Sequence, residues 1–93
     1  MEDLRISLIQ TNLRWEDKEA NRKMFAEKIK SISSATDLIL LPEMFSTGFS
    51  MNAFSLAEEL NGTTVNWMKE IAAEKKCTLC GSVIIREIGR AHV

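Results

Sequence analysis

The sequence predicts an α/β fold in which three strands alternate with two helices and pair in parallel. The central observation is residues 38–41, four consecutive apolar residues that are too few for a helix and too continuous for a half-exposed strand. Pro42 follows, and because proline has no N–H to donate, the chain must leave the sheet there. The order strand, helix, strand, helix, strand favours a parallel sheet with right-handed crossovers.

The residues before the central strand predict one strand and one helix. Residues 4–10 alternate as a strand does, and we expect them to pair beside the central strand. Asp17 can cap the helix that follows, which ends near Ser33. The apolar face of the strand consists of Leu4, Ile6 and Leu8. The apolar stripe of the helix consists of Phe25, Ile29 and Ile32, with Met24 at its margin. The solvent side of the helix consists of Lys18, Arg22, Glu27 and Lys30.

The residues after the central strand predict a loop, a second helix and a third strand. Residues 45–60 show little periodicity. Asn61–Thr64 then forms a turn and offers a threonine cap for a helix that ends near Lys75. Residues 77–85 predict the third strand. The expected inward face of the second helix consists of Val65, Met68, Ile71 and Ala72.

Glu43 is the first polar side chain past the carboxyl end of the central strand. Ligands of open α/β sheets gather at that edge, because side chains there face a crevice rather than a packed core. Two interpretations of Glu43 are open, an acid–base catalyst and a solvated glutamate in a turn. The apolar side chains of the next loop either line a substrate pocket or tuck under the sheet edge. They are Phe45, Phe49, Met51 and Phe54.

Residues 37–49, with Leu-Pro-Glu-Met-Phe at their centre and Ser-Thr-Gly-Phe after it, resemble the first catalytic segment of the carbon–nitrogen hydrolase (nitrilase) superfamily. The continuation Ser50-Met51-Asn52 is most similar to its omega-amidase branch. The resemblance extends to residues 6–15 and to the Asn21-Arg22 pair. It implies that residues 1–93 are the amino-terminal part of a single, incomplete domain. Their strand–helix–strand–helix–strand unit would be a portion of a nitrilase-type αββα sandwich.

The resemblance also implies a chemistry. Members of the superfamily use a Glu, a Lys and a Cys to hydrolyse non-peptide C–N bonds through an acyl-enzyme, without a metal or an organic cofactor. By this resemblance Glu43 is the general base, and Phe45 and Phe49 are substrate-pocket candidates. The family positions of the Lys and the Cys lie beyond this chain, so neither role is assigned here. The implied reaction releases ammonia from a small 2-oxo acid amide, and the 93-residue chain alone is expected to be inactive.

Composition excludes several classes of partner. The 12 basic residues are scattered and matched by 13 acidic ones, so there is no basic stripe to bind nucleic acid. No apolar run approaches the ~20 residues that span a bilayer. Met1-Glu2-Asp3 lacks the basic start of a signal peptide. We therefore expect a cytoplasmic protein with a small-molecule amide as substrate and no nucleic-acid or membrane partner.

The pair Cys77 and Cys80 invites a redox or a metal interpretation. A redox pair lies where a strand leads into a helix, whereas both thiols are expected at the start of a strand. Tetrahedral zinc needs four ligands, and only His92 could add a nitrogen. We expect ordinary buried cysteines with reduced thiols, no metal site and no role for His92. Residues 89–93 fit the family pattern poorly, as a truncated end would.

The central strand also predicts association. Two helices can cover only one side of a three-stranded sheet, yet residues 38–41 are apolar on both sides. The second cover must come from another copy, a partner chain or residues that this chain lacks, and we expect a homo-oligomer. The alternative function is a non-catalytic fragment or binding module that associates through this apolar face.

Overall fold

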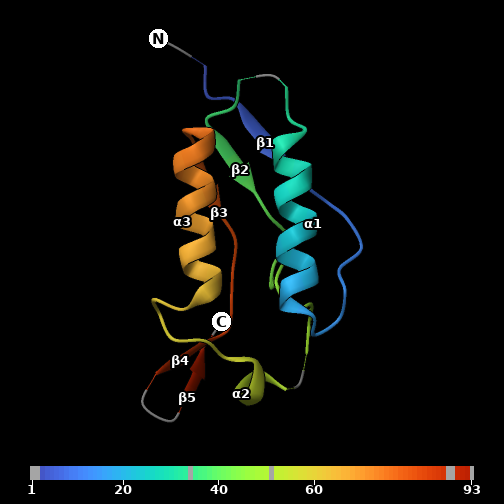
Figure 1. Cartoon of the computed structure of the whole chain (residues 1–93), viewed down its shortest axis with the longest axis vertical. Helices are drawn as coiled ribbons and strands as arrows, with labels where there is room; N and C mark the ends of the chain where they lie inside the picture. The colour runs from blue at the N-terminus through green and yellow to red at the C-terminus, as the bar shows by residue number, and fades with distance from the viewer. Residues whose placement is uncertain (1–2, 34, 51, 88–89, 93) are drawn as a thin grey trace.

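The computed structural model describes residues 3–33, 35–50, 52–87 and 90–92, and it gives residues 53–54, 86–87 and 90–92 as backbone only. The strands of the main sheet are β1 (Ile6–Leu8), β2 (Leu38–Leu40) and β3 (Thr78–Cys80), and the two long helices are α1 (Lys18–Lys30) and α3 (Thr63–Lys75). The strands are parallel in the order β1, β2, β3. Figure 1 shows α1 and α3 side by side over one face of this sheet. The predicted α/β fold is confirmed, as is the place of the first strand beside the central one.

The two faces of the sheet differ in how they are covered. Ile39 lies between Ser7 and Leu79 and is fully buried under the helices. Residues on either side of Ile39 point to the opposite face, because side chains alternate along a strand. On that face Leu4, Ile6 and Leu8 keep 65%, 51% and 70% of their surface exposed. Within the part of the chain that the structure describes, the two helices thus cover one face of the central strand, and the expected second cover stays a prediction.

The core lies between the sheet and the two helices. The ring of Phe45 makes an edge-to-face contact with Phe25, with centroids 5.6 Å apart, and a tilted contact with Trp67 at 5.8 Å. Such aromatic pairs add to the stabilisation that area burial alone provides. The buried apolar cluster consists of Phe25, Ile29, Ile39, Leu41, Phe45 and Ile71.

The predicted cap of α1 is confirmed, and the cap of α3 is not. The Asp17 carboxylate accepts the N–H of Ala20 at 3.1 Å, as a helix cap does. At α3 the cap position is Gly62, and the carboxylate of Glu58, six residues before Thr64, accepts the N–H of Thr64 at 2.8 Å. The threonine cap was therefore wrong, because the acceptor comes from the loop before the helix.

The third strand is shorter than predicted. After Cys80 the chain leaves the sheet, and a hairpin of β4 (Ile85–Glu87) and β5 (Arg90–His92) follows. Gly81 allows this exit, since a Cβ there would lie 2.8 Å from the Phe45 ring. The expectation of a strand to residue 85 was wrong, since β3 ends at Cys80 and Ile85 belongs to β4. In the segment 89–93, which was expected to fit the family pattern poorly, residues 90–92 form β5. The side chain of His92 lies outside the described residues.

The loop of residues 45–60 contains one short helix, α2 (Ala53–Leu56). The described residues include no helix with the length and apolar character needed to cross a membrane.

Candidate active site

Glu43 lies at the carboxyl end of β2, the edge at which the sequence places it. The N–H of Leu41 still donates to the Cys80 carbonyl oxygen at 2.8 Å, and Pro42 then ends the pairing. The side chain of Glu43 is exposed. Met44 follows with a φ of +48°, a left-handed backbone that is uncommon for a residue other than glycine. The chain therefore turns sharply at Met44, directly after Glu43.

Hydrogen bonds within the turn of residues 43–48 hold its shape. The Met44 carbonyl oxygen accepts the N–H groups of Thr47 at 3.1 Å and of Gly48 at 2.7 Å. From the β3 side, the Ser82 hydroxyl accepts the N–H of Met44 at 2.8 Å. This last bond fixes the residue directly after Glu43, so the base candidate has a defined place relative to the sheet.

The connection between β1 and α1 holds the same turn from the other side. Asn21, which is fully buried, donates from Nδ2 to the Ser46 carbonyl oxygen at 2.8 Å and to the Arg14 carbonyl oxygen at 2.7 Å. Its Oδ1 accepts the N–H of Arg14 at 2.8 Å. The N–H of Glu16 donates to the Thr47 carbonyl oxygen at 2.7 Å. Residues 14–21 and 46–47 are thus joined by backbone and side-chain bonds.

Further contacts extend this junction to residue 52. The Glu16 carboxylate accepts the hydroxyl of Ser50 at 2.5 Å and the amide of Asn52 at 2.7 Å. The indole N–H of Trp15 donates to the Phe49 carbonyl oxygen at 3.1 Å. The two segments that carry the sequence resemblance, residues 6–15 and 37–52, therefore meet beside Glu43.

The two aromatic pocket candidates have different surroundings. Phe45 has no exposed surface and packs in the core, which matches the alternative in which it tucks under the sheet edge. Phe45 is therefore not part of the proposed site. Phe49 is 72% exposed beside the Glu43 turn, and its role as a pocket wall stays a prediction. Met51 and the side chain of Phe54 lie outside the described residues.

The cysteines are placed differently from the expectation. Cys77 is half-buried before β3, and Cys80 is exposed at the end of β3 rather than at its start. Both are free thiols. Among the described residues there is no group of three or more His, Cys, Asp or Glu side chains suited to hold a metal ion.

A polar cluster at the amino ends of α1 and α3 was not predicted from the sequence. Lys18 and Arg22, expected on the solvent side, are half-buried. The Lys18 ammonium lies 3.5 Å from Glu58, and the Arg22 guanidinium donates to the Thr64 hydroxyl at 3.1 Å. That hydroxyl donates to Glu58 at 2.5 Å.

The environment of Glu58 changes the acidity of its carboxyl group. Burial alone would raise the pKa, but the hydrogen bonds from Thr64 and the positive charge of Lys18 outweigh burial and hold the pKa of Glu58 below its ordinary value. The cluster could not be found by pattern, because a Lys and an Arg on a helix usually indicate a solvated face.

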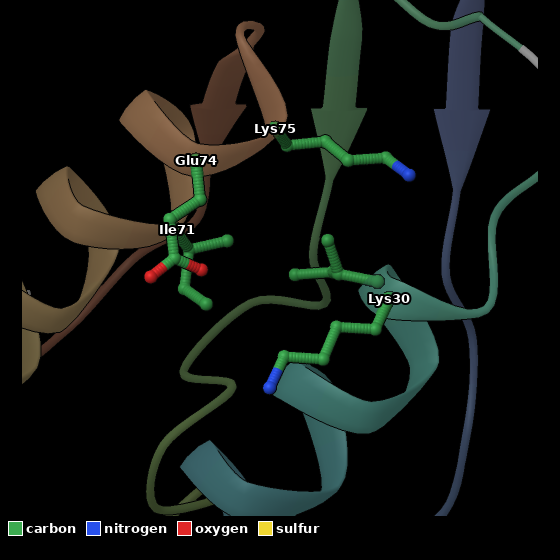
Figure 2. A pocket seen from close by; sticks show the side chains of 5 residues that line it. Lys30, Ile71, Glu74 and Lys75 are labelled. Carbon is green, nitrogen blue, oxygen red and sulfur yellow. The ribbon is translucent and has the colours of Figure 1, made fainter.

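A hollow of about 230 Å³ lies between the last turns of α1 and α3. Figure 2 shows that side chains of both helices face it. Because these helices lead into β2 and β3, the hollow lies at the edge where those strands begin, and Glu43 lies at the edge where they end. It is therefore separate from the candidate active site. Its lining consists of Ile29, Lys30, Ile71, Glu74 and Lys75.

Comparison with known proteins gives a consistent family. The sequence model of the carbon–nitrogen hydrolase family matches residues 5–92. The chain is 39% identical over 88 residues to the omega-amidase YafV of Escherichia coli K12, covering 92% of this chain and 33% of that protein. It is 37% identical over 87 residues to the omega-amidase YafV of Yersinia enterocolitica, covering 91% of this chain and 32% of that protein.

A solved structure supports the same conclusion. The chain is similar to XC1258 from Xanthomonas campestris, a CN-hydrolase superfamily protein whose crystal structure has an arsenic adduct in the active site. The TM-score is 0.91 at 38% identity, over 98% of this chain and 34% of that one. The chain spans about one third of the length of these relatives. Since the family match covers almost all of its residues, the chain belongs to the carbon–nitrogen hydrolase family.

Proposed function

We propose that this chain is the amino-terminal part of a Cys-dependent hydrolase of non-peptide C–N bonds, with Glu43 as its general base. The observation that carries the proposal is an exposed carboxylate at the carboxyl end of β2, followed by a turn that is hydrogen-bonded on both sides. The similarity to proteins named omega-amidases supports an omega-amide as substrate, and the substrate that we propose is a small 2-oxo acid amide. The lysine, the cysteine and the cover of the exposed sheet face would come from residues that this chain lacks.

In the proposed reaction Glu43 accepts the proton of a cysteine thiol as the sulfur attacks the amide carbon. A lysine stabilises the negative charge that develops on the carbonyl oxygen. The C–N bond breaks, the proton passes from Glu43 to the nitrogen, and ammonia leaves a thioester. Water then attacks the thioester and gives a proton to Glu43. The C–S bond breaks, the thiolate regains that proton, and the net products of amide and water are acid and ammonia.

A general base acts only when its oxygen lies within hydrogen-bond reach of the proton it accepts. A displacement of ~1 Å can lower a rate by about 10²-fold. The bonds that fix the Glu43 turn serve this chemistry, because they give the backbone that carries the exposed Glu43 side chain a defined place.

The proposal is tested with the longer protein that it requires, incubated with a short 2-oxo omega-amide. We expect one ammonia per acid formed and, after rapid quenching, a protein adduct with the mass of the substrate less ammonia. The 93-residue chain is the matched control and should give neither product, because a base without a nucleophile cannot form the acyl-enzyme. A longer protein that gives neither ammonia nor adduct would contradict the proposal.

A second candidate function is a non-catalytic module that binds another chain through its sheet. The exposed apolar row of Leu4, Ile6 and Leu8 favours it, since exposed apolar patches mark association sites. Under this alternative Glu43 is a solvated turn residue. The two candidates differ in one measurable respect, which is whether removal of the Glu43 carboxylate changes a rate.

A further inference from the structure

Asn21 is an unusual residue for the buried face of a helix. It is fully buried in the first turn of α1, four residues before Phe25 of the apolar core. A buried amide costs free energy unless its donors and acceptor are satisfied. Here both kinds of group are used, with two bonds donated and one accepted. A fully satisfied buried polar group of this kind fixes geometry more than it adds stability.

The partners of Asn21 show which geometry it fixes. One bond goes to Ser46, three residues after Glu43, and the others go to Arg14 in the connection after β1. The Asn21 amide is therefore a bridge from α1 to the turn that begins at Glu43. Its bond to Ser46 joins residues 25 positions apart.

The constraint passes from Ser46 to Glu43 through the turn itself. The two N–H groups after Ser46 donate to the Met44 carbonyl oxygen, and Met44 has a left-handed backbone. A non-glycine residue holds such a conformation only where its surroundings determine it. The Ser82 hydroxyl accepts the N–H of Met44 near the start of this turn, and the Asn21 amide donates to Ser46 within it. Together these two bonds hold the turn.

We infer that Asn21 is a positioning residue for Glu43. The inference rests on the proposed function, because the place of the Glu43 carboxylate affects a rate only if that carboxylate transfers a proton. Asn21 itself touches no reacting atom. It acts by holding the Ser46 end of the turn, which keeps the carboxylate at the edge of the sheet where a thiol would be presented to it.

The experiment compares Asn21→Ala with Thr64→Val in the longer protein. Thr64 is the matched control, because it is also a fully buried polar residue, but its bonds go to Glu58 and Arg22 rather than to the Glu43 turn. Both variants should melt at lower temperatures. Well below those temperatures we expect Asn21→Ala to lower kcat by roughly 10-fold to 10²-fold with little change in KM, and Thr64→Val to leave kcat within about twofold of the parent.

A double-mutant cycle shows whether Asn21 acts through Glu43. In the Glu43→Gln background, Asn21→Ala should change kcat by less than about threefold, because the group that it positions is already absent. An equal loss in both backgrounds would overturn the inference and leave the proposed function intact. A Glu43→Gln variant within a few-fold of the parent would instead overturn the proposed function, and the inference with it.

If Asn21→Ala does not fold, the shape-matched Asn21→Asp takes its place in the cycle. It keeps an acceptor for Arg14 but loses the amide donors to Ser46 and Arg14. Amide hydrogen exchange should then be faster at Thr47 and Gly48 than in the parent, with little change at Ile39. Unchanged exchange in the turn, or unchanged kcat in the folded Asp variant, would overturn the inference.

Discussion

Glu43 owes its place to the residues that flank it. Pro42 stops the strand pairing, and Met44 turns the chain with a left-handed backbone that Ser82 and Asn21 help to hold. The position of Glu43 could be predicted from the sequence, because a proline after a short apolar run ends a strand by local chemistry. The role of Asn21 could not, since its partner Ser46 is distant in sequence and offers only a backbone carbonyl.

Phe45 shows a second limit of prediction at this scale. A phenylalanine in a loop with little periodicity fits both a pocket wall and a core position from the sequence. The structure buries it against Phe25 and Trp67, and the absence of a side chain at Gly81 makes room for the ring. Such a choice depends on contacts between distant segments, which no local pattern records.

The cysteines provide a prediction for single residues. Cys80 lies at the same sheet edge as Glu43, on the strand next to β2, but neither thiol is assigned the nucleophile role. In the longer protein, the double variant Cys77→Ser with Cys80→Ser should keep kcat for ammonia release within about twofold of the parent, at most with a lower melting temperature. A loss of kcat with unchanged melting would show that one of these thiols takes part in catalysis.

At the scale of elements, α1 and α3 are joined at their amino ends by the cluster of Lys18, Arg22, Glu58 and Thr64. The extents of both helices were predicted to within a few residues, because apolar periodicity and the Asp17 cap are local signals. The hydrogen-bond acceptor at the start of α3 and the residue at which β3 ends were not predicted, because each depends on a loop contact. The Glu58 carboxylate and the Gly81 approach to Phe45 are those contacts.

The lowered pKa of Glu58 predicts a pH dependence of stability. A carboxyl whose pKa is lower in the folded than in the unfolded state stabilises the fold above its ordinary pKa of 4.5, and this contribution is lost as the pH falls through the lowered value. In the longer protein, Glu58→Gln should therefore reduce the free energy of unfolding at pH 7. The difference from the parent should shrink as the pH is lowered below 4.5.

Urea denaturation at a series of pH values measures this difference. Glu70→Gln is the control, since Glu70 is exposed on α3, and it should track the parent across the whole range. A Glu58→Gln difference that stays constant with pH, or grows in acid, would contradict the assigned cause.

At the scale of the whole molecule, α1 and α3 lie over one face of the main sheet (Figure 1). The exposed apolar row of Leu4, Ile6 and Leu8 lies on the other face. The need for a second cover could be predicted from residues 38–41, because a strand that is apolar on both sides must be enclosed on both. What covers this face could not be predicted, since the sequence within one chain carries no signal for it.

Exposed apolar surface costs about 25 cal/mol per Å², so the 93-residue chain alone is expected to self-associate. Sedimentation velocity at tens of micromolar, an order-of-magnitude choice suited to weak association, should show species larger than a monomer. The double variant Leu4→Lys with Leu8→Lys should reduce them by placing charge on the apolar row. Leu60→Lys, at an equally exposed leucine outside the sheet, should not. A monodisperse parent monomer that binds no hydrophobic dye would contradict the need for a cover.

The most direct test of the central claim is the rate of ammonia release by Glu43→Gln in the longer protein, with a short 2-oxo omega-amide as substrate. Glutamine preserves the shape of Glu43 but cannot accept the thiol proton. Glu27→Gln is the matched control, because Glu27 is an exposed glutamate on α1 away from the site. We predict that Glu43→Gln lowers kcat by about 10²-fold to 10⁴-fold and that Glu27→Gln leaves it unchanged. A Glu43→Gln rate within a few-fold of the parent would show that Glu43 is not the base.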